Sequence, residues 1–132
     1  MSCIFDKIVA GQMPSNKVLE DDKFLAFHDI NPRAPVHILI IPKKHYESFV
    51  ECSSDDLNHV MEVAQKIAKK MQENLHCDGI NILSNVGEQA GQSVHHFHVH
   101  LIPRYKDSDV IQIEFNPIES VDFSEIIQKI GF

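Results

Sequence analysis

The stretch from Val94 to Arg104 alternates histidines with apolar residues. Successive side chains of a β-strand point to opposite faces of the sheet. One face would therefore carry His96, His98 and His100, and the other Phe97, Val99 and Leu101. Packing of the apolar face fixes the register, because a slip by one residue would bury the histidines instead. The pattern predicts a strand over Val94–Pro103 that holds three imidazoles in a rigid row.

Three imidazoles on one face have two functional interpretations. Neutral imidazole is a common ligand of zinc and other transition metals. Alternatively, one imidazole acts as a nucleophile or an acid–base group and its neighbours position it. The preceding loop, Asn85–Ser93, contains two glycines and several neutral hydrogen-bond donors, which suit phosphate oxygens. This loop favours the second interpretation.

The remaining pattern predicts an α+β domain built on a mainly antiparallel sheet. Apolar spacing indicates a short helix around Ile4–Val9 that ends at Gly11, and a long amphipathic helix from Ser53 to about Asn74. Ser53 and Asp56 suit the first turn of that helix as a capping box. Further strands are expected at Lys17–Glu20, Phe24–Asp29, Val36–Ile41, Gly79–Asn85 and Val110–Phe115, and a last helix at Val121–Ile130.

Composition narrows the class of protein. A chain of 132 residues without repeats or a change in composition is expected to form a single domain, 1–132. The net charge of −7 argues against a nucleic-acid-binding face, which needs Lys and Arg to neutralise phosphates. The longest apolar run, Val36–Pro42, is too short to cross a membrane. With no visible secretory signal and three widely spaced cysteines, a cytoplasmic protein is expected.

The segment His96–Ile102 reads His-x-His-x-His-x-x with apolar residues at x, and it resembles the signature of the histidine triad superfamily. Phe24–Ile30, Ala34–His45 and Ala90–Val94 are similar to its histidine triad nucleotide-binding (Hint) branch. The resemblance covers roughly residues 3 to 104. It implies a five-stranded, mainly antiparallel sheet with one long and one or two short helices, and a two-fold homodimer whose sheets join.

The resemblance also implies the catalytic roles. His98, the middle histidine, would be the nucleophile that attacks the α-phosphorus of a nucleotide. Ser93, Gln92 and His100 would stabilise the phosphate and the leaving group, with Ser93 helping to protonate an amine. The supporting hydrogen-bond relay behind the nucleophile would consist of His96 and His37.

A nucleotide-binding set follows from the same resemblance. Asp29 would accept hydrogen bonds from both ribose hydroxyls, and Asn85 and Gly91 would lie near the ribose and phosphate. Apolar and aromatic side chains hold a base without reading its edge, so the preference among purines is expected to be mild. The positions that match this base pocket are Ile4, Phe5, Ile8, Phe27, His28, Ile30 and Leu39.

A zinc site is a further expectation by resemblance. Related bacterial proteins carry a structural zinc on Cys-x-x-Cys and two histidines, whereas Cys3 is followed here by Asp6 in the second cysteine's place. The candidate ligands are then Cys3, Asp6, His45 and His95. One thiolate makes a poorer structural zinc site than two.

The resemblance implies a purine nucleoside phosphoramidase or nucleotidyl hydrolase that releases AMP or GMP and requires no cofactor. A dinucleoside polyphosphate hydrolase is the alternative enzyme, which Ile102-Pro103-Arg104 favours and Ser93 disfavours. A nucleotide-binding interaction protein with little turnover is an alternative from another class, and a metal-binding module is the last one. Intact His98, His37 and Ser93 favour an enzyme.

Overall fold

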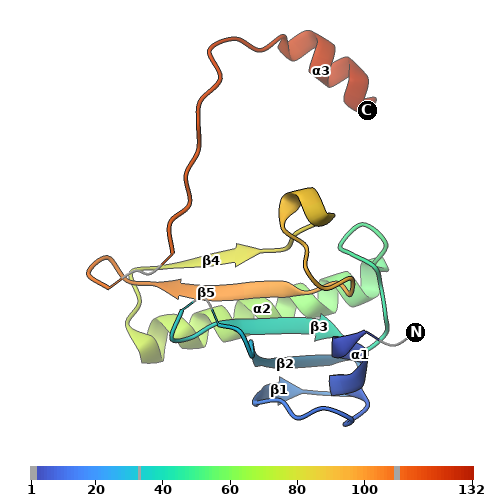
Figure 1. Ribbon diagram of the computed structural model, residues 1–132, viewed down its shortest axis with the longest axis vertical. Helices are drawn as coiled ribbons and strands as arrows, with labels where there is room; N and C mark the ends of the chain where they lie inside the picture. The colour runs from blue at the N-terminus through green and yellow to red at the C-terminus, as the bar shows by residue number, and fades with distance from the viewer. Residues whose placement is uncertain (1–2, 33, 109–110) are drawn as a thin grey trace.

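The computed structural model describes residues 3–32, 34–108 and 111–132 (Figure 1). Five strands form one antiparallel sheet in the order β1-β2-β3-β5-β4. The strands are β1 Lys17–Glu20, β2 Phe24–His28, β3 Ile38–Pro42, β4 Gly79–Leu83 and β5 Val99–Arg104. The helices are α1 Ile4–Val9, α2 Ser54–Leu75, α3 Phe123–Ile130 and the 3₁₀ helix η1 Glu88–Ala90. The expected α+β fold with a five-stranded antiparallel sheet is confirmed.

Two apolar clusters cover opposite faces of the sheet. On one face, alternate residues of β2 and β3 pack against α2, as Phe24 and Ile40 do. On the other face, the residues between them, such as Phe27 and Leu39, pack against Phe5 of α1. All of β3 is buried, which confirms the expectation of a central strand covered on both faces.

The histidine segment is only partly a strand. β5 begins at Val99, five residues later than the expected start at Val94, because the chain bends at residues 94–96 and the amide of Phe97 donates to the Tyr46 carbonyl oxygen at 2.7 Å. The alternation of faces nevertheless holds. Phe97, Val99 and Leu101 all belong to the cluster that packs against α2.

The ends of α2 follow local capping chemistry. The Ser53 hydroxyl accepts a hydrogen bond from the Asp56 amide at 3.2 Å, which confirms Ser53 as the N-cap. The helix ends where His76 adopts a left-handed conformation with φ of 51°. α1 ends at Val9 with Ala10 as its C-cap, and Gly11 follows with a φ of +75°, a backbone conformation that glycine adopts without strain.

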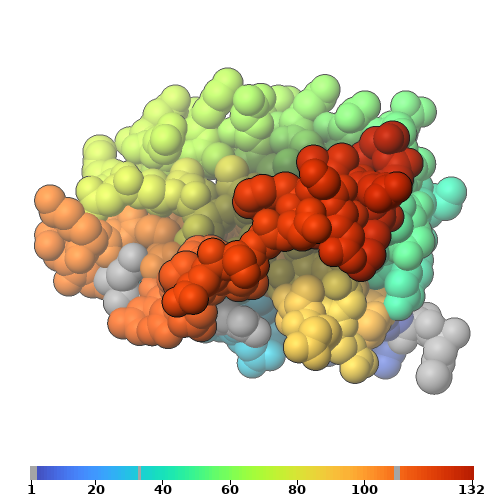
Figure 2. Space-filling model, turned by 90° about the horizontal axis from the view of Figure 1, so that it is seen from above, coloured from blue at the N-terminus to red at the C-terminus, as the bar shows by residue number. Residues whose placement is uncertain are grey.

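The C-terminal arm, residues 105–132, differs from the expectation. The strand expected at Val110–Phe115 is wrong for residues 111–115, which form no ladder, while Val110 lies outside the described residues. The Arg104 guanidinium instead donates to the side chain of Asn81 and the carbonyl of Ile111, which holds the start of the arm beside β4 and β5. The arm rises from the body in Figure 1 and lies in front of it in Figure 2.

The last helix, α3, starts two residues later than expected because Asp122 caps it by accepting from the Glu125 amide at 3.1 Å. None of its residues is buried. In the described part of the chain, no helix is long and apolar enough to cross a membrane.

Candidate active site

His98 is buried, with 5% of its surface exposed, and its ring meets the edge of Phe5 at a centroid distance of 5.1 Å. Its Nδ1 atom lies 2.7 Å from the backbone carbonyl oxygen of His96. Because a carbonyl oxygen only accepts, Nδ1 carries the proton, and Nε2 of the neutral ring holds a lone pair. Burial lowers the pKa of His98 below its ordinary value of 6.5, although the bond to the His96 carbonyl acts in the opposite direction. A neutral imidazole with this tautomer has the lone pair that a nucleophile needs.

The ring of His100 in β5 pairs with that of His37, the residue just before β3. Their Nδ1 and Nε2 atoms lie 2.8 Å apart, and His37 Nε2 is also 3.7 Å from the Asp29 carboxylate. Only one of the two nitrogens in the short contact carries the proton, so the bond fixes complementary tautomers on the two rings. The ring of His100 lies beside that of His98, with 4.8 Å between centroids. His37 therefore orients His100.

The ring of His96 points away from this pair. It is fully buried, and its Nε2 donates to the Pro42 carbonyl oxygen at 2.8 Å. Its Nδ1 lies 3.2 Å from an Asp6 oxygen and 3.5 Å from Cys3 Sγ. Burial lowers the pKa of His96, so the neutral ring presents the Nδ1 lone pair to that cluster. His96 therefore contacts the His98 ring through its backbone carbonyl, while its own ring contacts Asp6 and Cys3.

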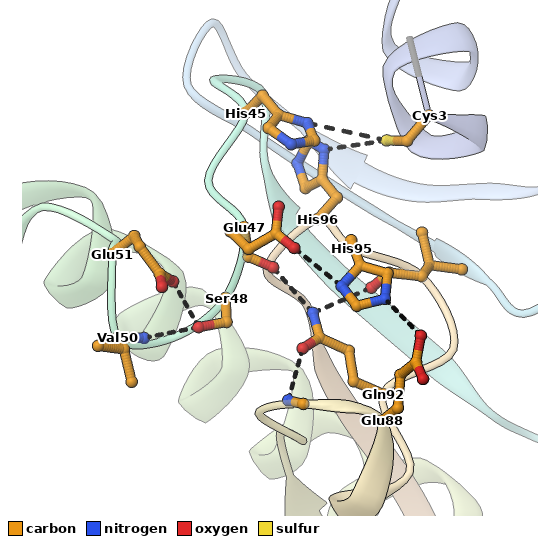
Figure 3. A network of polar contacts seen from close by, with 12 residues as sticks. Cys3, His45, Glu47, Ser48, Val50, Glu51, Glu88, Gln92, His95 and His96 are labelled. Carbon is orange, nitrogen blue, oxygen red and sulfur yellow. Dashed lines mark hydrogen bonds and ion pairs between the residues drawn. The ribbon is translucent and has the colours of Figure 1, made fainter. Parts of the chain in front are cut away.

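The cluster around His96 contains most of the expected zinc ligands. Donor atoms of Cys3, Asp6, His45 and His96 all lie within 4.8 Å of one another. His95 was the expected fourth ligand, but its ring contacts Glu47 at 2.9 Å and Glu88 at 3.8 Å. The bend at residues 94–96 separates the two neighbouring histidines, and His96 takes the fourth position (Figure 3).

A pocket of about 210 Å³ opens beside His98. Eight residues of the expected site, five from the nucleotide-binding set and three from the catalytic set, line it together with Asn31 and Val94. The eight are Ile4, Phe5, Asp29, Ile30, Leu39, Ser93, His98 and His100. The combination of one carboxylate, apolar walls and an imidazole suits a nucleoside attached to a reactive phosphate.

A second pocket of about 250 Å³ contains His37, Asn85 and Gly91. Ser93 and His100 line both pockets, so they lie between the two. The second pocket is also lined by Ile111, Gln112 and Ile113, which the sequence reasoning missed. No motif marks these arm residues. They reach the site because Arg104 binds the carbonyl of Ile111.

Four expected nucleotide-site residues line neither pocket in the described part of the chain. Ile8 and Phe27 are buried in the apolar cluster under α1. His28 is half-buried at the end of β2. Gln92 is buried and its amide is bonded to backbone groups of its own loop and of Glu47. Apolar members of this set therefore support the pocket wall from behind.

Comparisons with known proteins were made for the whole chain. The family model described as the HIT domain matches residues 10–107. An uncharacterised HIT-like protein of Methanocaldococcus jannaschii is 43% identical over 129 residues, which cover 97% of this chain and 98% of that protein. An adenosine 5′-monophosphoramidase of Candida albicans is 39% identical over 129 residues, 95% of this chain and 84% of that protein.

Solved structures show the same similarity in three dimensions. A HIT family protein from Bacillus anthracis superposes with a TM-score of 0.88 at 39% identity and covers 98% of this chain and 92% of its own. A histidine triad nucleotide-binding protein from Candida albicans has a TM-score of 0.83 at 38% identity, covering 97% of this chain and 92% of its own. Coverage this complete extends into the C-terminal arm.

The lowered pKa of His98 can be checked by titrating its ring. In EDTA-containing buffer, an NMR titration of this ring is expected to show a midpoint below 6.5. The pKa of His98 is lower in the folded chain than in the unfolded chain. At a pH between these two values the unfolded chain binds more protons than the folded one, so the free energy of unfolding falls as the pH drops through that interval. For this group the loss is at most about 1.4 kcal/mol per pH unit. A midpoint at or above 6.5 would contradict the assignment of a desolvated neutral ring.

Proposed function

The chain belongs to the HIT domain family, and from this membership we propose that it is a purine nucleoside phosphoramidase that releases AMP or GMP through a nucleotidyl-histidine intermediate. The observation that carries the proposal is the hydrogen bond from His98 Nδ1 to the His96 carbonyl, which leaves the lone pair on Nε2 beside a pocket. The activity named for the Candida albicans relative supports the choice of a phosphoramidase.

In the first step, the Nε2 lone pair of His98 attacks the α-phosphorus and the P–N bond to the amine breaks. The leaving nitrogen takes a proton, and a hydroxyl or imidazole that lines both pockets suits this role, as Ser93 and His100 do. The ring becomes a cation while it carries the nucleotidyl group. The His96 carbonyl that accepts from Nδ1 stabilises this charge.

In the second step, water attacks the same phosphorus and the Nε2–P bond breaks, while one proton of the water returns to the group that protonated the amine. The products are the nucleoside monophosphate and neutral His98, so the enzyme returns to its starting state. Neither step requires a metal. Splitting one displacement into two lets a single nucleophile serve amines of different structure, because the amine has left before water enters.

The two pockets support a division of the substrate. The Asp29 carboxylate and the apolar walls formed by residues such as Ile4 and Leu39 would take the ribose and the base. Ser93 and His100, which line both pockets, would contact the phosphate. The second pocket, with Asn85 and Gln112 in its wall, would then face the leaving group. Apolar walls do not read the edge of a base, which favours acceptance of both adenine and guanine.

Dinucleoside polyphosphate hydrolysis is the competing reaction. Its support in the sequence is Ile102-Pro103-Arg104 after the triad, a segment that dinucleoside-hydrolase relatives share. In the folded chain the Arg104 guanidinium donates to Asn81 and to the Ile111 carbonyl. This structural role of Arg104, together with Ser93 in the wall of both pockets, favours the phosphoramidate as the substrate.

Replacing the nucleophile tests the proposed reaction. His98→Ala is expected to lower AMP release from an adenosine 5′-phosphoramidate by at least about 10³-fold, because no other group can form the intermediate. Release is followed by chromatography in the presence of EDTA, with a dinucleoside polyphosphate as the second substrate. His59→Ala, a histidine paired with Asp21 at 2.9 Å outside both pockets, is the control. A wild-type chain that binds AMP but turns over neither substrate would instead be a nucleotide-binding interaction protein.

We also propose that two copies of the chain form a two-fold homodimer through β4 and α2. β4 is an edge strand of the sheet and leaves one side of its backbone unpaired. A groove of about 770 Å³ lies between β4 and α2, with Met61, Ile80 and Ile82 among its apolar residues. Two such edges can pair about a two-fold axis and join the sheets, which covers both grooves at once.

The homodimer is tested by placing a charge in the groove. Ile82→Asp is expected to convert the dimer into a monomer in analytical ultracentrifugation, because both copies would bury the new carboxylate. Leu19→Asp is the matched control, since Leu19 is 45% exposed on the opposite edge strand and Ile82 is 52% exposed. Dimers of equal stability in both variants would rule out this interface.

The cluster of Cys3, Asp6, His45 and His96 is proposed as a structural zinc site. His96 donates its Nε2 proton to a backbone carbonyl, the arrangement that prepares the other ring nitrogen of a histidine for a metal. Burial raises the pKa of the Cys3 thiol, so zinc would have to displace its proton. The ion would join α1 to the histidine segment and take no part in the reaction.

We also propose a cytoplasmic location. Its support is that Cys3, Cys52 and Cys77 are free thiols, as is usual for proteins in a reducing compartment.

Removing one zinc ligand tests that site directly. The wild-type chain and the control Cys77→Ala are expected to retain one zinc per chain by elemental analysis, and Cys3→Ala to lose it. Chelation is expected to lower the melting temperature of the wild type only to that of Cys3→Ala, because both states lack the ion. Zinc retained by Cys3→Ala, or absent from the wild type, would refute this ligand set.

A further inference from the structure

The loop from Gly87 to Ser93 contributes two residues to the walls of the pockets. Gly91 lines the second pocket and Ser93 lines both. Two hydrogen bonds between the same residues close the loop at its base. The backbone N–H of Gly87 donates to Gln92 Oε1 at 2.8 Å, and the backbone N–H of Gln92 donates to the Gly87 carbonyl oxygen at 3.0 Å.

The nitrogen of the Gln92 side-chain amide attaches this loop to the rest of the molecule (Figure 3). Its Nε2 atom donates to the Glu47 carbonyl oxygen at 2.8 Å and to the Val94 carbonyl oxygen at 3.1 Å. Gln92 is 4% exposed, and both of its N–H donors and its oxygen are engaged. A side chain committed to three backbone groups is not available to a substrate phosphate.

The segment that receives Gln92 is itself anchored. The Tyr46 hydroxyl donates to Asp56 at 2.5 Å, next to the N-terminus of α2, and the Tyr46 carbonyl accepts from Phe97 at 2.7 Å. Ser48 is buried and accepts from the Val50 amide at 3.1 Å. The attachment point for Gln92 is therefore tied to α2 and to the histidine segment.

A second contact joins the same two segments at the surface. The ring of His95 lies 2.9 Å from an oxygen of Glu47 and 3.8 Å from an oxygen of Glu88 in η1 (Figure 3). All three side chains are exposed, so this contact contributes at most about 1 kcal/mol. The buried amide of Gln92 is the stronger of the two attachments.

We propose that Gln92 is a positioning residue whose side chain holds the Gly87–Ser93 loop in its reactive shape and makes no contact with the substrate. The catalytic part of this inference rests on the proposed phosphoramidase activity. Only glutamine satisfies all three backbone groups. Glutamate accepts from Gly87 but has no proton for the carbonyls of Glu47 and Val94, and alanine leaves all three unsatisfied.

The fastening is tested without any reaction, by hydrogen exchange of the Gly87 amide in NMR. Gln92→Ala is expected to speed this exchange by at least about tenfold, which corresponds to the roughly 1.4 kcal/mol typical of one lost buried hydrogen bond. Gln89→Ala is the matched control, because Gln89 is an exposed residue of the same loop. Unchanged exchange in Gln92→Ala would overturn the fastening role, whether or not the chain proves to be an enzyme.

The positioning role is tested by separating turnover from binding. Gln92→Ala and Gln92→Glu are expected to lower kcat by about 10- to 100-fold, because a displacement near 1 Å at Ser93 costs that much. The Kd for AMP is expected to stay within about threefold, since the base and ribose pocket does not include Gln92. A Kd that rises in step with the loss of kcat would show direct contact with the phosphate. Faster exchange with unchanged kcat would also overturn the proposal.

If Gln92→Ala fails to fold, Gln92→Glu carries the turnover and binding test, because it preserves the size of the side chain. In this variant the Gly87 amide keeps its acceptor, so faster exchange there would report the loss of the two Nε2 bonds that fasten the loop. A wild-type chain that releases no AMP would refute the proposed function but would leave the exchange result interpretable. The two failures are therefore distinguishable.

Discussion

The packing of Phe97, Val99 and Leu101 against α2 determines where every other side chain of the histidine segment can lie. A buried Phe stabilises a fold by about 3–5 kcal/mol relative to Ala, so the segment cannot rotate without losing a large part of the domain's stability. The histidines alternate with these residues and must turn to the opposite side of the sheet. The site is thus oriented by the core.

Different hydrogen-bond partners give the three histidines of the segment different roles. His96 donates to the Pro42 carbonyl, His98 donates to the His96 carbonyl, and His100 bonds to the ring of His37. The two backbone carbonyls select opposite nitrogens for protonation, so His96 presents Nδ1 and His98 presents Nε2 as the unprotonated atom. The unprotonated nitrogen of His96 therefore faces a thiol and a carboxylate, whereas His98 lines the first pocket.

Local periodicity was sufficient to predict most strands and the long helix, whereas the residues that meet around His98 were predicted from the resemblance to the histidine triad superfamily. Alternation and helical spacing depend only on neighbouring residues, which is why β3 and α2 were recognisable. The bend at residues 94–96, which exchanges His95 for His96 in the cysteine cluster, depends on a long-range bond from Phe97 to Tyr46. Gln112 reaches the second pocket through Arg104, and Gln92 is committed to backbone atoms elsewhere in the chain. Such partners are invisible to a pattern read along the chain.

One residue, His96, performs two tasks with separate atoms. Its peptide carbonyl sets the tautomer of His98, the proposed nucleophile, and its imidazole belongs to the cysteine cluster on the other side. A peptide group is the same whatever side chain it carries, so the first task places no demand on the identity of residue 96. A substitution in the cluster, such as one at Asp6, can therefore change what the His96 ring binds while the hydrogen bond that sets the His98 tautomer stays in place, because that bond belongs to the main chain.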